Sequence, residues 1–72
     1  MHLSDLGKTV RKLRKERNFT QEALAKEIGI SRATLSKLEN GYLGNVSIST
    51  LNNTLSILGY ELDIKPYNPF TN

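Results

Sequence analysis

Two short helical segments joined by one glycine constrain the fold of this 72-residue chain more than any other feature. Thr20 can cap the first segment, because its hydroxyl can accept a hydrogen bond from a backbone N–H that the helix leaves unpaired. Apolar residues then recur at helical spacing, at Leu24, Ala25 and Ile28. Gly29 can adopt a positive φ without a steric penalty, so the chain can turn sharply and begin a second helix after Ser31. The pattern predicts two helices that meet at a tight turn and cross closely.

The second of these helices, which Asn40 and Gly41 end, has two different faces. Leu35 and Leu38 have the spacing of an inward-facing stripe. The opposite face carries short polar and cationic side chains, namely Arg32, Ala33, Ser36 and Lys37. Such a helix directly after a tight turn has the sequence form of a DNA-reading helix-turn-helix. The alternative is an ordinary capped amphipathic helix, but the small Ala25, the glycine turn and the cationic face together favour DNA reading.

Length and composition limit the other possibilities. A chain of 72 residues forms one domain near the lower size limit for a stable monomer, so we expect an oligomer. With no cysteine and with its one histidine, His2, near a terminus, the chain offers neither a disulfide framework nor a metal or catalytic cluster. No apolar run approaches the roughly 20 residues that span a bilayer, and the N-terminus does not resemble a signal peptide. We expect a cytoplasmic, non-enzymatic protein without metal or cofactor.

The net charge of +3 is distributed unevenly along the chain. Up to Asn40 there are nine lysines and arginines against five acids, whereas the remainder has one lysine against two acids. Five of the cations form a cluster: Arg11, Lys12, Arg14, Lys15 and Arg17. A basic N-terminal region indicates a surface that faces phosphates. For most of the cluster, a solvated helix face is an equally good interpretation.

Two further helices flank this pair. The spacing of Leu3, Leu6, Val10 and Leu13 predicts a first helix at about 4–17, followed by Phe19 as an anchor of the next loop in the core. Ser47 can cap a fourth helix that Gly59 ends. Its predicted inward stripe consists of Ile48, Leu51, Leu55 and Leu58.

After Gly59 the apolar period changes from helical to alternating. Tyr60, Leu62 and Ile64 alternate with charged residues, which predicts a half-buried strand over about 60–65. A lone strand leaves its backbone groups unpaired, so we predict that it pairs with the same strand of a second chain in a homodimer. The alternative is an extended tail that covers the helical core. We thus predict a mainly α fold of four helices and one C-terminal strand, with residues 1–65 as the domain and 66–72 as a short tail.

Several motifs in this sequence resemble the Xre/Cro-type helix-turn-helix family of bacterial and phage repressors. They are Leu13-Arg14, Phe19-Thr20-Gln21, Leu24-Ala25, Ile28-Gly29-Ile30-Ser31 and Leu38-Glu39-Asn40-Gly41. Within that family the chain is most similar to HipB-type antitoxins, through Gly29-Ile30, Ala33-Thr34, Ser36 and residues 58–64. The resemblance implies a lambda-repressor-like domain that binds a palindromic operator as a dimer, represses its own operon and binds a HipA-like kinase toxin. The alternative is a stand-alone Xre/Cro-type or phage-type regulator with no toxin partner.

The resemblance also implies roles for individual residues. Arg32, Ala33, Ser36 and Lys37 are expected to face base edges, while Gln21 and Asn40 are expected to contact phosphates. Thr34 is equally consistent with phosphate contact and with packing. Arg14 and Glu39 are expected to form a structural ion pair between the first and third helices. Ala23 stands where the family often has an acid that completes a capping box, so Thr20 should cap its helix alone.

Overall fold

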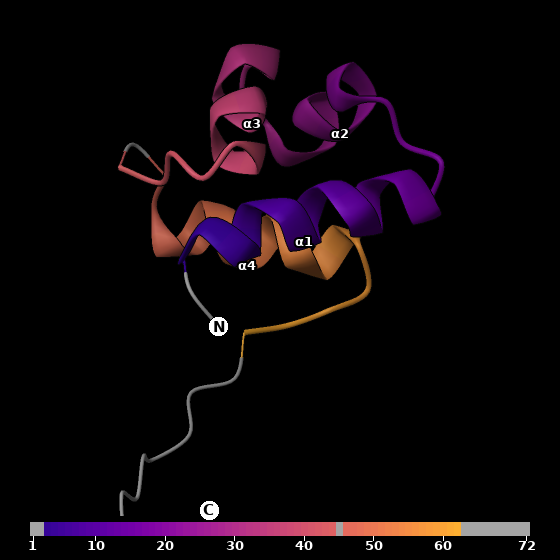
Figure 1. Ribbon diagram of the computed structural model, residues 1–72. Coiled ribbons are helices and arrows are strands. Elements are labelled where there is room, and N and C mark those ends of the chain that lie inside the picture. Colours follow the sequence, from indigo (N-terminus) through magenta and orange to yellow (C-terminus); the bar gives the residue numbers. More distant parts are fainter. Residues whose placement is uncertain (1–2, 45, 63–72) are drawn as a thin grey trace, which may run out of the picture.

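This computed structural model describes residues 3–44 and 46–62 of the chain. The described part contains four helices joined by short loops. They are α1 (Leu3–Glu16), α2 (Gln21–Ile28), α3 (Arg32–Glu39) and α4 (Ile48–Ile57). Helices α2 and α3 lie together above α1 and α4 (Figure 1). Helix α3 packs against both α1 and α2, and α4 packs against α2. The predicted mainly helical fold is confirmed for these residues.

Three polar side chains start helices where the sequence predicts them. Thr20 Oγ1 accepts a hydrogen bond from the N–H of Ala23 at 3.0 Å, and Ser31 Oγ accepts one from Thr34 at 3.1 Å. Ser47 caps α4 in the same way, through the N–H of Thr50 at 3.0 Å. Each bond satisfies a backbone donor that the first turn of a helix cannot pair internally.

Gly29 makes the turn between α2 and α3. Its φ of 86° lies in the left-handed region, and its N–H donates to the carbonyl oxygen of Ala25 at 2.9 Å. A Cβ at this position would meet no atom within 4 Å. The backbone conformation, rather than crowding, therefore requires glycine here.

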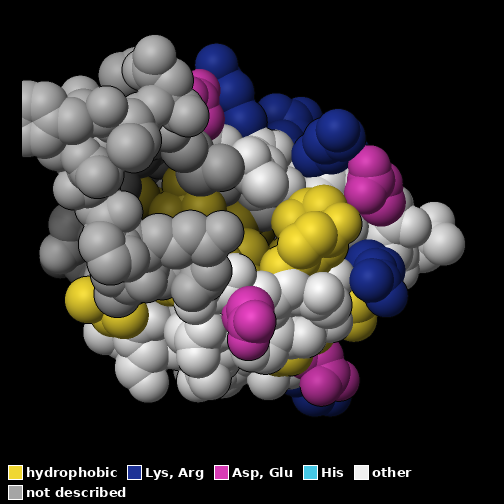
Figure 2. Space-filling view, turned by 90° about the horizontal axis from the view of Figure 1, so that it is seen from below, with side chains coloured by type: hydrophobic (Ala, Val, Ile, Leu, Met, Phe, Trp, Pro, Cys, Tyr) yellow, Lys and Arg dark blue, Asp and Glu magenta, His cyan; other side chains and the backbone are white. Residues whose placement is uncertain are grey.

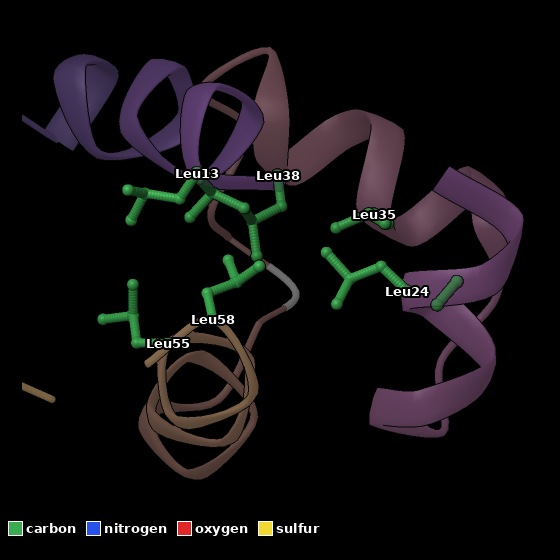
Figure 3. Packing of buried hydrophobic residues seen from close by; sticks show 8 residues of the cluster. Leu13, Leu24, Leu35, Leu38, Leu55 and Leu58 are labelled. Carbon is green, nitrogen blue, oxygen red and sulfur yellow. The ribbon is translucent and has the colours of Figure 1, made fainter. Parts of the chain in front are cut away.

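The core lies where all four helices meet. Figure 3 shows leucines from α1, α2, α3 and the C-terminal end of α4 converging on one centre. The buried cluster consists of Val10, Leu13, Leu24, Ala25, Leu35, Leu38, Leu55 and Leu58. Phe19 packs against this cluster from the loop after α1, as predicted. The periodic stripes predicted for α2 and α3 are thus confirmed.

The predicted stripe of α4 is wrong at its first position. Ile48 is 79% exposed, while Leu55 and Leu58 are buried and Leu51 is half-buried. Side chains lean toward the N-terminus of their helix, so that of the first residue projects past the packed part of α4. Thr54, which lies outside the predicted stripe, is also fully buried and donates its hydroxyl to the carbonyl oxygen of Thr50 at 2.8 Å. That bond satisfies the hydroxyl inside the core.

Gly7 permits a close approach between α1 and the end of α3. A Cβ on this buried residue would collide with the carbonyl oxygens of Leu38 and Glu39. Only a residue without a side chain allows the two backbones to come so near. This contact holds the C-terminal end of α3 directly on α1.

After α4 the described chain continues through Gly59, whose φ is 89°, to Leu62. Residues 60–62 form no strand, and the rest of the predicted strand, residues 63–65, lies outside the described residues. Tyr60 and Leu62 are 51% and 41% exposed. On the face seen from below, hydrophobic side chains are visible near the middle, with charged side chains around them (Figure 2). In the described part, no helix has the length and apolar character needed to cross a membrane.

Candidate nucleic-acid interface

One face of helix α3 is exposed to solvent, and its other face is packed in the core. Arg32, Ala33 and Lys37 are exposed and Ser36 is half-buried. Leu35 and Leu38, on the opposite face, have no exposed surface. Because the apolar face is packed against α1 and α2, the backbone from which the outward side chains project is held in place.

Arg14 and Glu39 form a two-bond ion pair between α1 and α3. Arg14 Nε lies 2.7 Å from Glu39 Oε2, and Arg14 Nη2 donates to Glu39 Oε1 at 3.1 Å. The two side chains are only 9% and 2% exposed. Arg14 Nη1 also donates to the carbonyl oxygen of Phe19 at 2.8 Å. Both charges are thus compensated inside the protein, as a buried pair requires.

Gln21 connects this ion pair to the outer face of α3. Its side-chain nitrogen donates to Glu39 Oε1 at 3.2 Å, and its side-chain oxygen accepts from Arg32 Nε at 3.5 Å. The carboxylate of Glu39 therefore orients the amide of Gln21, which in turn turns its oxygen toward Arg32. We call this series of hydrogen-bonded side chains, Arg14, Glu39, Gln21 and Arg32, the polar row.

Asn40 and Thr34 both make local hydrogen bonds. Asn40 is exposed, and its Nδ2 donates to the carbonyl oxygen of Ser36 at 2.9 Å. Thr34 is half-buried, and its hydroxyl shares a 2.8 Å hydrogen bond with the hydroxyl of Ser31 at the start of α3. Thr34 thus belongs to the cap of α3, whereas Asn40 stands at its end.

Two surface hollows contain five of the seven predicted DNA-contacting residues, while Ala33 and Ser36 line neither of them. The first, of about 650 Å³, contains Gln21, Arg32 and Asn40 together with the ion pair and Arg11. The second, also of about 650 Å³, contains Thr34 and Lys37 beside the loop that follows α3. Helix α3 therefore contributes side chains to both hollows.

Arg11 lines the first hollow, although its sequence position indicates only membership of a general cationic cluster. Glu22 also lines this hollow, so the surface is mixed in charge near the start of α2. The signal that could have identified Arg11 is its helical spacing from Lys8 and Lys15, which puts these cations on one side of α1.

A family of proteins described as helix-turn-helix matches residues 10–65, which include α2, the turn at Gly29 and α3. The chain belongs to this helix-turn-helix family. The matched segment extends over most of the chain and includes the candidate site residues on α2 and α3.

Two curated relatives resemble this helix-turn-helix chain over about three quarters of its length. One is the "Uncharacterized HTH-type transcriptional regulator RghRB" of Bacillus subtilis, 39% identical over 56 residues, which are 78% of this chain and 40% of the relative. The other is the "Putative antitoxin HigA2" of Mycobacterium tuberculosis, 38% identical over 55 residues, 76% of this chain and 54% of the relative. The chain thus spans about half or less of the length of these relatives.

The fold also resembles a solved structure, "Crystal Structure of Apo-HppE", with a TM-score of 0.75. The similarity covers 85% of this chain and 34% of the other, at 21% sequence identity. At that identity the likeness shows a shared helix-turn-helix fold and carries no information on activity.

Proposed function

We propose that this chain is a sequence-specific DNA-binding regulator that inserts α3 into the major groove. The observation that carries the proposal is the outward face of α3, where Arg32, Ala33 and Lys37 are exposed on a helix whose other face is packed in the core. A major groove about 12 Å wide admits one α-helix. Membership of the helix-turn-helix family and a relative named as a transcriptional regulator support the same role.

Base reading is assigned to four side chains of α3. Arg32 and Lys37 are suited to the O6 and N7 acceptors of guanine, and the methyl group of Ala33 to the methyl group of thymine. Ser36 is half-buried and would contact a base only at close approach. Specificity is therefore expected to come mainly from Arg32 and Lys37.

Phosphate contact is assigned to the start of α2 and the end of α3. Gln21 is the first residue of α2, where free backbone N–H groups and the helix dipole attract an anion. Asn40 stands at the end of α3. Thr34 is a third candidate, although its hydroxyl already bonds to Ser31. These contacts would fix the position of α3 without reading sequence.

We further propose a homodimer on palindromic DNA, formed by pairing of residues 60–65 between two chains. The exposure of Tyr60 and Leu62, together with the apolar Ile64 two positions on, supports a strand with one apolar side. A two-fold dimer would place two recognition helices about 34 Å apart, one turn of DNA. The small size of the domain also favours association.

The biological role that we propose is that of an antitoxin which represses its own operon and binds a HipA-like kinase toxin. The similarity of residues 58–64 to the HipB-type strand supports this, and the name of the mycobacterial relative supports an antitoxin in general. The second candidate is a stand-alone transcriptional regulator, which the name of the Bacillus relative favours. The two candidates share the DNA-binding surface and differ in the partner protein.

Two measurements test these proposals. Selection of bound duplexes from a random library should yield a palindromic consensus, and Arg32→Ala should relax one position of it while Lys26→Ala, on the exposed side of α2, should not. A library that yields no consensus would refute sequence-specific binding. Co-expression with the adjacent gene should then recover a kinase-like protein together with this chain. Recovery of specific DNA without such a partner would favour the stand-alone regulator.

A further inference from the structure

Helix α1 carries a row of four exposed cations that the proposed base and phosphate contacts do not use. The row consists of Lys8, Arg11, Lys12 and Lys15. Residues at this spacing occupy one side of a helix and span about 10 Å along its axis. Within residues 3–44 and 46–62, none of the four forms an ion pair with a carboxylate. Their charges are therefore available to a partner.

The four cations surround a hollow of about 360 Å³, which Glu39 and Asn40 complete. Glu39 adds little negative charge to it, because both of its carboxylate oxygens are bonded to Arg14. The field in this hollow is therefore set by the lysines and Arg11. A concave surface lined by one sign of charge concentrates counter-ions.

This hollow adjoins the one that contains Gln21 and Arg32. Arg11, Glu39 and Asn40 line both. The positive surface of α1 thus begins at the end of α3 and leads away from it along the protein. An anionic partner that touches α3 and Asn40 would pass directly onto this row.

We propose that the cation row of α1 binds backbone phosphates of the DNA that flanks the segment read by α3. The inference rests on the proposed DNA-binding function and extends its footprint. Double-stranded DNA carries one charge per about 3.4 Å on each strand, so a 10 Å row can meet about two or three phosphates. Because the row meets phosphates rather than bases, its contribution should be independent of sequence.

The salt dependence of affinity for a random-sequence duplex of about 30 base pairs measures these contacts, since each one changes the slope of log K against log salt by about 0.9. Arg11→Gln/Lys15→Gln removes one arginine and one lysine from the row. Arg17→Gln/Lys26→Gln is the matched control, because it removes the same charges at exposed positions that line neither hollow. We expect the slope to fall by about 1.8 per protomer in the first variant and by less than half of that in the control.

Equal falls in both variants would show a general effect of net charge and would overturn the proposal, as would an unchanged slope in the first variant. If the wild-type protein has no measurable affinity for the duplex even at about 50 mM salt, the proposed DNA-binding function fails instead. Thermal unfolding checks that both variants are folded. If the first is not, Lys8→Gln/Lys12→Gln replaces it and tests the same row.

Discussion

The ion pair between Arg14 and Glu39 is predicted to carry a large share of the stability of this domain. A domain of this size has an unfolding free energy of roughly 4 to 11 kcal/mol, at about 0.05 to 0.15 kcal/mol per residue. With side-chain exposures of 9% and 2%, removal of either partner leaves the other charge buried and unpaired. Removal of one partner should lower the unfolding free energy by about 3 to 5 kcal/mol. This corresponds to a fall in Tm of about 12 °C or more. Either single substitution should therefore remove about a quarter or more of the unfolding free energy.

The assay is a double-mutant cycle in thermal and urea unfolding with Arg14→Met and Glu39→Gln. Because the pair is a unit, the double variant should lose about as much stability as one single variant, which gives a coupling energy of about 3 kcal/mol. Arg11→Met and Glu27→Gln are matched controls, since they change the same residue types at exposed positions. Their losses should stay within about 0.5 kcal/mol. Single losses below about 1 kcal/mol that simply add in the double variant would refute the reasoning.

Three other perturbations have defined outcomes. Gly7→Ala should lower the unfolding free energy by about 1 to 3 kcal/mol in urea titration, because its Cβ would collide with the carbonyl oxygens of Leu38 and Glu39. Gly44→Ala is its control, because a Cβ there meets no atom within 4 Å; equal losses in both would argue against the close contact. Arg32→Ala should weaken binding by about 1 to 3 kcal/mol on a selected duplex and by little on a scrambled one. Asn40→Ala, at a proposed phosphate contact that does not bond to Arg32, should weaken both alike; anisotropy titrations distinguish the two patterns. Leu62→Asp should shift sedimentation equilibrium at micromolar concentration toward monomer, because it puts a charge into the proposed strand pair; an unchanged dimer would place the interface elsewhere.

The helix caps, the turn at Gly29 and the apolar stripes follow from the sequence alone, because each depends on residues only a few positions apart. Thr20, Ser31 and Ser47 each cap a helix through an N–H three residues later. Gly29 makes its turn through its own φ. The apolar stripes of α2 and α3 follow from the 3.6-residue period alone. These features can be predicted from sequence because their causes lie within one or two helical turns.

The tertiary structure alone decided how distant segments meet. The period of α4 could not show that Ile48 lies beyond the packed part of the helix, nor that Thr54 belongs to the core. The approach of α1 to α3 at Gly7 depends on the angle and separation of two helices, which no local pattern encodes.

The same holds for the candidate site. The ion pair between Arg14 and Glu39 was expected from a family resemblance. The other two hydrogen bonds of the polar row were not, because Gln21 lies 18 positions from Glu39 and 11 positions from Arg32. The two neighbouring hollows likewise share Arg11 from α1 and Asn40 from the end of α3, which only the packing of the two helices brings together. Helical periodicity places a side chain on a face, but only the packing of the helices determines which faces share a surface, because that choice minimises the exposed apolar area of the whole domain.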